Sequence, residues 1–153
     1  MSHDSFYSVK TKYLYPNQNI TDMKPKMIWA NLAVTDLERT QKFYTELGFR
    51  PNNPHTSNEL VSFFMAGNEF IIHFFLQTVI ENNLKSMKFG DPHHSNEIIF
   101  TLSAENKTQV DNWAEEVKNA GGTIVSEPET FGDNYYGFVF ADPDGHKFNV
   151  FFM

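Results

Sequence analysis

The feature that most constrains the fold is an order of predicted elements that occurs twice along the 153 residues. In the first half, residues 27–34 form a short apolar run typical of a strand, and residues 35–47 have the apolar spacing of an amphipathic helix. Two Phe-rich runs follow at residues 60–65 and 70–76, with a polar, Gly-containing turn between them. These two runs predict a hairpin.

The second half of the sequence repeats this order. Residues 98–102 predict a strand, an amphipathic helix follows, and a further strand begins at residue 123. Two apolar runs, 135–141 and 146–152, then surround an Asp-Pro-Asp-Gly sequence, in which Pro fixes φ and Gly supplies the positive φ of a tight turn. Each half is therefore predicted to be one strand, one helix and three strands, with a period near 70 residues.

Both predicted helices have start and stop signals. Thr35 opens a capping-box pattern before the first helix, and Gly48 stands where a glycine ends a helix. The second helix is expected to begin at Ser103 or Ala104 and to end at Gly121.

The repeat predicts an α+β fold of two βαβββ modules. The strands are apolar on both faces, so both faces must be covered. One face can meet the helix of its own module. The other must meet the opposite module or enclose a pocket.

The same pattern divides the chain into an extension and a domain. Residues 1–26 show no regular periodicity and are expected to be an N-terminal extension of the domain at 27–153. We expect the first module at about 27–76, a polar linker at about 77–95, and the second module at about 96–153.

Composition narrows the classes of partner. Sixteen Phe, six Tyr and two Trp give an aromatic content that either fills a Phe-rich core or lines a cavity. A net charge of −7 argues against nucleic acid and against anionic membranes. The absence of Cys excludes thiolate sites and fits the cytoplasm, and no run of apolar residues is long enough for a membrane span. We therefore expect a cytoplasmic location.

Two stretches resemble a known superfamily. Residues 31–40, followed by Phe43-Tyr44 and Leu47-Gly48-Phe49, resemble the opening strand and helix of vicinal-oxygen-chelate proteins, and residues 138–148 resemble their closing hairpin. This superfamily includes glyoxalases, bleomycin-resistance proteins and extradiol dioxygenases. The resemblance covers residues 27–153 and is nearest to the predicted lactoylglutathione lyase-like subgroup.

The resemblance implies a curled mixed sheet around an open cup, with the helices outside. Many members hold a divalent metal in that cup, with ligands from the first and fourth strands of each module. Such a metal, with open coordination positions, acts as a Lewis acid on two neighbouring substrate oxygens.

The family's metal positions are only partly matched here. Two of them fall on Trp29 and Ile99, whose side chains have no metal donor. A third falls on Asn149, and the fourth on either Ile72 or His73, because a shift of one residue exchanges the two faces of a strand. The ordinary metal site is therefore expected to be lost.

Two hypotheses about function follow. The first is a small-molecule binding protein with an aromatic-lined cup and no cofactor. The alternative is a lyase, isomerase or dioxygenase with one divalent metal in a displaced site of His73, Glu97 and Asn149. His73 can equally be a structural histidine that hydrogen-bonds within its strand pair.

We expect a small-molecule ligand and a complete cup in each chain, with a homodimer as a further option. The candidate cup residues, chosen by strand parity and family position, are Trp29, Asn31, Phe63, Glu97, Thr101, Asn149 and Phe151.

Overall fold

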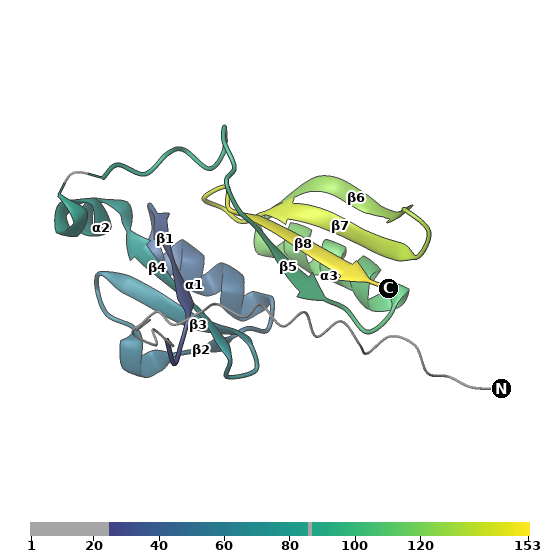
Figure 1. The fold of residues 1–153 in the computed structure, drawn as a ribbon, viewed down its shortest axis with the longest axis horizontal. Coiled ribbons are helices and arrows are strands. Elements are labelled where there is room, and N and C mark those ends of the chain that lie inside the picture. Colours follow the sequence, from purple (N-terminus) through teal and green to yellow (C-terminus); the bar gives the residue numbers. More distant parts are fainter. Residues whose placement is uncertain (1–24, 86) are drawn as a thin grey trace, which may run out of the picture.

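The computed structural model describes residues 25–85 and 87–153, and these form the predicted α+β fold of two βαβββ modules (Figure 1). The first module consists of β1 (Trp29–Val34), α1 (Leu37–Glu46), β2 (Arg50–Pro51), the short 3₁₀ helix η1 (Asn53–His55), β3 (Leu60–Ala66) and β4 (Phe70–Leu76). After α2 (Gln77–Leu84), the second module consists of β5 (Ile99–Ser103), α3 (Lys107–Ala120), β6 (Thr123–Phe131), β7 (Tyr135–Ala141) and β8 (Lys147–Phe152). Of the predicted extension 1–26, residues 1–24 lie outside the described residues.

Each module has its own four-stranded mixed sheet. The strand orders are β1-β4-β3-β2 and β5-β8-β7-β6, so the two modules have the same topology. In each sheet the first strand pairs in parallel with the last and the other pairs are antiparallel. Figure 1 shows the sheets side by side, and they do not join into a closed barrel. No helix in the described parts of the chain is long and apolar enough to cross a membrane.

The two main helices begin later than their sequence signals indicated. In α1 the N-cap is Asp36, whose carboxylate accepts from the Arg39 amide, and the expected capping box at Thr35 is not formed. Thr35 instead donates to Asp144 of the second module. In α3 the cap is Asn106, not Ser103 or Ala104. Gly121 ends α3 with a φ of 96°, as predicted.

The region predicted to be a polar linker contains a helix, α2. It packs against β4 and β1, with Ile80 buried. Glu81 accepts hydrogen bonds from the side chains of Lys88 and Gln77 and from the Phe89 amide, which lower the pKa of Glu81 to about 2. These contacts hold the start of the linker against the helix.

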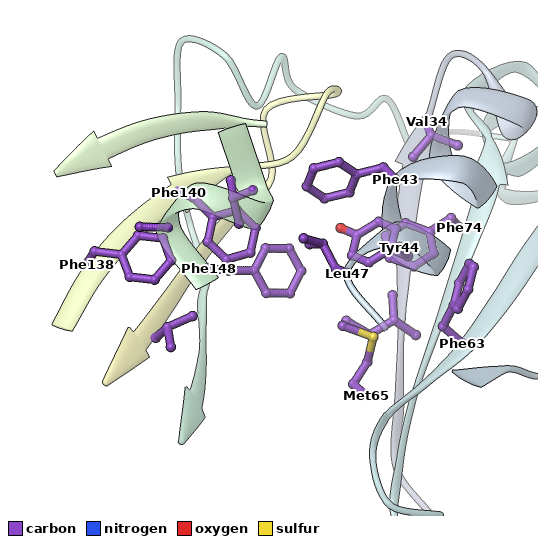
Figure 2. Packing of buried hydrophobic residues seen from close by; sticks show 14 of the residues in the cluster. Val34, Phe43, Tyr44, Leu47, Phe63, Met65, Phe74, Phe138, Phe140 and Phe148 are labelled. Atoms are coloured by element: carbon purple, nitrogen blue, oxygen red, sulfur yellow. The ribbon is translucent and has the colours of Figure 1, made fainter. Parts of the chain in front are cut away.

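A single apolar core joins the two modules. Helix α1 packs on one face of the first sheet and α3 on one face of the second, and the two helices also contact each other. Figure 2 shows Phe43 and Tyr44 of α1 between the aromatic side chains of both sheets. The Tyr44 ring lies 4.4 Å from Phe74 of the first sheet and 6.0 Å from Phe148 of the second, between ring centroids. The modules therefore fold against each other through their helix-covered faces.

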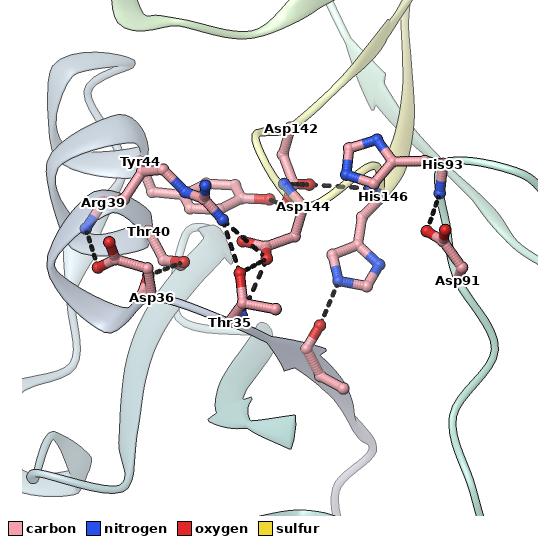
Figure 3. Close-up of polar contacts among 11 residues, drawn as sticks. Thr35, Asp36, Arg39, Thr40, Tyr44, Asp91, His93, Asp142, Asp144 and His146 are labelled. Carbon is pink, nitrogen blue, oxygen red and sulfur yellow. Dashed lines mark hydrogen bonds and ion pairs between the residues drawn. The ribbon is translucent and has the colours of Figure 1, made fainter. Parts of the chain in front are cut away.

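A polar junction also connects the modules at the start of α1 (Figure 3). Asp144, in the β7–β8 turn, accepts hydrogen bonds at Oδ1 from the Thr35 amide at 2.9 Å, the Thr35 hydroxyl at 2.8 Å and the Arg39 guanidinium at 2.9 Å. The adjacent Asp142 accepts from the Tyr44 hydroxyl at 2.7 Å, and a ring nitrogen of His146 lies 2.8 Å from the Ala33 carbonyl oxygen. The junction therefore fixes the end of β1 relative to the second module.

Candidate functional site

Among the described residues, the face of the first sheet opposite α1 is exposed along β1, at Trp29 and Asn31, and is covered only at Ser62; we call it the first open face. Its residues are set by the strand register, which places Asn31 beside His73 and Ser62 opposite His73. Trp29 is 50% exposed at its edge. The side chains on this face are Trp29, Asn31, Ser62, Phe64, Ile71, His73 and Phe75.

The register resolves the choice between Ile72 and His73. Ile72 is completely buried in the core, whereas His73 lies on the first open face. Asn31 pairs with His73 in the first sheet as Thr101 pairs with Asn149 in the second. His73 and Asn149 therefore hold equivalent positions in the two modules.

His73 is part of a short polar chain that crosses the hairpin. Its Nδ1 lies 2.8 Å from the Ser62 hydroxyl oxygen, which accepts from the Asn52 side-chain amide at 3.2 Å. The His55 ring is 5.8 Å away and the Trp29 ring 6.3 Å away, between centroids. Burial and, to a lesser extent, the charge of His55 lower the pKa of His73, so its ring is neutral at neutral pH.

The corresponding face of the second sheet is the second open face. It is lined by Ile99, Thr101, Ser126, Glu129, Phe131, Gly137, Val139 and Asn149, around a cavity of about 430 Å³. Phe151 continues it, with its ring 5.9 Å from that of Tyr135. All of these residues belong to the second module. A cup lined by both modules of one chain, which the sequence analysis expected, is not seen on this face.

Phe63 was wrongly assigned to the cup. It pairs with Ile72 on the helix-covered face of the first sheet, is 1% exposed, and packs 5.6 Å from the Tyr44 ring. Because successive residues of a strand point to opposite faces, its neighbours Ser62 and Phe64 lie on the open face instead.

Glu97 lies outside both open faces, and of the other candidates only Asn31 shares its cleft. It precedes β5 and lines a separate cleft of about 280 Å³ with Asn31, Phe89 and His146. The three residues of the displaced metal site are therefore in three different places. His73 lies on the first open face, Glu97 lies in this cleft, and Asn149 lies on the second open face. Within residues 25–85 and 87–153 no three His, Asp or Glu side chains are grouped so that they could hold a metal ion.

The residues at the family's metal positions do not fit a complete metal centre within one chain. Trp29 and Ile99 offer no donor atom, and the two remaining positions, His73 and Asn149, stand on different sheets. No catalytic step through a metal follows from this arrangement.

Sequence reasoning missed Ser62, Asn52, His55 and Glu129. Ser62 had a readable signal, since it is the only polar residue in the apolar run 60–65 and so indicates which face of that strand is not core. The other three lie in or near turns and bulged segments, where periodicity carries no information about direction.

Comparisons with known proteins agree with this fold. Residues 26–150 match the family model described as the Glyoxalase/Bleomycin resistance protein/Dioxygenase superfamily. A comparison with curated proteins found no match.

Three solved structures illustrate the similarity. A hypothetical protein from S. aureus is 29% identical, with a TM-score of 0.73 over 85% of this chain and 95% of that one. A glyoxalase-related enzyme from Fulvimarina pelagi is 21% identical, with a TM-score of 0.72 over 84% and 89% of the two chains. A lactoylglutathione lyase from Agrobacterium tumefaciens is 20% identical, with a TM-score of 0.61 over 84% and 94%.

Proposed function

Because the chain belongs to the glyoxalase/bleomycin resistance protein/dioxygenase superfamily, we propose that it is a small-molecule binding protein whose open sheet faces hold a planar or amphipathic ligand without a metal. The observation that carries this proposal is the chemistry of the two open faces. At the positions where the family places metal donors, this chain presents a half-exposed indole, Trp29, and a half-exposed aliphatic side chain, Ile99. Large apolar groups at such positions favour burial of a ligand over coordination of a metal.

The proposal includes a homodimer, because each open face is only half of a cup. The first face carries the Arg50 guanidinium, stacked 3.8 Å from the centre of the Phe64 ring. The second face carries Glu129. In a twofold dimer the first face of one chain would meet the second face of the other, which gives two identical enclosed sites with complementary charges. The proposal keeps the cytoplasmic location expected from the sequence.

Tryptophan fluorescence tests the location of the site. The chain has two tryptophans, Trp29 on the first open face and Trp113 on α3, packed against Phe49 at 5.7 Å. Titration with naphthalene derivatives should change the fluorescence of the wild type and of Trp113→Phe, but not that of Trp29→Phe. Trp29→Ala should weaken binding by roughly 1 to 3 kcal/mol. A signal that survives in Trp29→Phe and disappears in Trp113→Phe would place the ligand elsewhere.

Metal analysis tests the other half of the proposal. Protein purified without chelator should contain far less than one zinc, nickel, iron or manganese per chain, because two of the four family positions have no donor. A stoichiometric metal that is lost in His73→Ala and in Asn149→Ala, but retained in a variant of the loop residue His94, would instead support the metal-dependent enzyme.

A further inference from the structure

The hydrogen-bond chain behind His73 has a direction. Asn52 Nδ2 donates to Ser62 Oγ at 3.2 Å, and Ser62 is completely buried, so its own hydroxyl proton needs a partner inside the protein. Besides Asn52, the side chain within hydrogen-bond distance of the Ser62 hydroxyl among the described residues is His73, whose Nδ1 lies 2.8 Å away. Ser62 therefore donates to Nδ1, which must be unprotonated, and the proton of the neutral ring is on Nε2.

This polarity is the reverse of what a metal ligand requires. A histidine that binds a metal through Nε2 carries its proton on Nδ1 and donates it to a group behind the ring. In this chain the group behind the ring is itself a donor. The chain of Asn52, Ser62 and His73 therefore leaves an N–H, not a lone pair, at Nε2, the ring nitrogen that is not bonded to Ser62.

The side chains around the Nε2–H group of His73 favour an aromatic ring of a ligand beside it. The Trp29 ring meets the His73 ring edge-on at 6.3 Å, and the Phe75 ring does so at 6.2 Å from the other side. Arg50 lies at the edge of the same face, over Phe64, and also donates to Asn68. Aromatic walls, a neutral donor and a nearby guanidinium together suit an aromatic ligand with an anionic oxygen.

We propose that His73 is a specificity-determining residue that donates from Nε2 to a carboxylate oxygen of an aromatic ligand, with its tautomer fixed by Ser62 and Asn52. This inference rests on the proposed binding function and names its ligand class. The acceptor lies over the first open face, where the ligand ring packs against Trp29.

The tautomer can be measured without any ligand. Long-range ¹H–¹⁵N correlation spectra of imidazole nitrogens should show His73 as the Nε2–H form at neutral pH. In Ser62→Ala the Nδ1 atom loses its donor, so the spectrum should move toward a mixture of both tautomers. His94, whose side chain is 85% exposed, provides the control, since its signals should not change in that variant. An Nδ1–H form in the wild type, or a tautomer unaffected by Ser62→Ala, would overturn the proposal.

Ligand preference is then measured with three matched probes: naphthalene, 2-naphthoate and 2-naphthylmethylammonium. The wild type and His94→Phe should bind 2-naphthoate more tightly than the ammonium compound. His73→Phe should weaken 2-naphthoate about tenfold while leaving naphthalene binding nearly unchanged, because only the hydrogen bond is removed.

The outcomes separate this inference from the proposed function. Equal binding of the three probes, or a carboxylate preference that survives in His73→Phe, would refute the role of His73 and leave the aromatic site standing. Failure of all three probes to bind would refute the aromatic site itself, and the role of His73 with it.

Discussion

Tyr44 and Asp142 form a buried polar pair inside the shared core. The Tyr44 hydroxyl donates to Asp142 Oδ2, while Oδ1 of the same carboxylate accepts from the amides of Asp144 and His146. Burial raises the pKa of Asp142 above its ordinary value near 3.8, and the Asp144 charge adds to the rise, although His146 and the Tyr44 hydrogen bond oppose it. Burial, together with Asp142, also raises the pKa of Tyr44. Both groups therefore titrate differently in the folded and unfolded chains.

The raised pKa of Asp142 gives a prediction for stability against pH. The folded protein binds this proton more tightly than the unfolded chain does, so the contribution to stability is present at low pH. It is lost as pH rises from about 3.8 through the folded pKa. Relative to Asp142→Asn, the wild type should therefore lose unfolding free energy across this window. Urea denaturation of both proteins between pH 4 and 7 measures the difference.

Tyr44→Phe provides a second comparison over the same pH range. Asp142→Asn should remove this loss of stability, whereas Tyr44→Phe should extend it. Removing the hydroxyl takes away a hydrogen bond to the charged carboxylate, so the pKa of Asp142 should rise further and the loss should extend to higher pH. The variant should also be less stable by about 1–3 kcal/mol at neutral pH, since Asp142 Oδ2 loses its donor. A wild type that gains stability over Asp142→Asn as pH rises would contradict the account.

At the residue scale, strand alternation predicted which sheet face is exposed for some candidates and not for others. The faces of Trp29, Asn31, Thr101 and Asn149 follow from parity, because alternation in β1, β5 and β8 leaves one side of each strand less buried than the other. Phe63 was misplaced because β3 is apolar on both faces, so hydrophobicity alone does not identify the core side. The hydrogen bonds from Asn52 to Ser62 and between Ser62 and His73 could not be predicted. They join residues of different segments, and no single segment of the sequence contains them.

Among the elements, the contact between the start of α1 and the β7–β8 turn should carry much of the coupling between modules. Asp144→Ala removes the acceptor of the Thr35 amide and hydroxyl, both partly buried, and should cost about 2–4 kcal/mol. Arg39→Ala removes a partner that is 43% exposed and should cost less than about 1 kcal/mol. Urea unfolding of both variants measures the two costs, and equal costs would show that the ion pair, not the Thr35 hydrogen bonds, holds the junction.

The order of elements was predictable, whereas caps and the extra helix were not. Both modules follow from hydrophobic periodicity, except that no apolar run marks the two-residue strand β2, and Gly121 ended its helix as expected. Thr35 is used to bind Asp144 across the module boundary, which leaves the cap to Asp36. Helix α2 depends on contacts with β4 and on hydrogen bonds to Glu81 from residues beyond its end, so its local sequence reads as polar linker.

At the scale of the whole molecule, both open faces expose apolar surface. Each face belongs to a separate sheet, and each has a large apolar side chain that is exposed by half or more: Trp29 at 50% and Ile99 at 53%. Exposed apolar patches on a folded domain typically mark binding surfaces. A twofold dimer that pairs unlike faces covers both at once and leaves no unpaired face to propagate a chain of subunits.

The proposed dimer gives a prediction, and the same experiment tests which faces meet. Light scattering after size-exclusion chromatography should give the wild type twice the 17.7 kDa mass of one chain, and Trp29→Glu and Ile99→Glu should each give single chains. Leu84→Glu, at an exposed apolar site on α2, should leave the mass unchanged.

A mixture of the Trp29→Glu and Ile99→Glu variants should form dimers again, because one of the two contacts in the mixed dimer then joins two unaltered faces. If the dimer instead pairs like faces, only one of the two substitutions will dissociate it, and a monomeric wild type would exclude both arrangements.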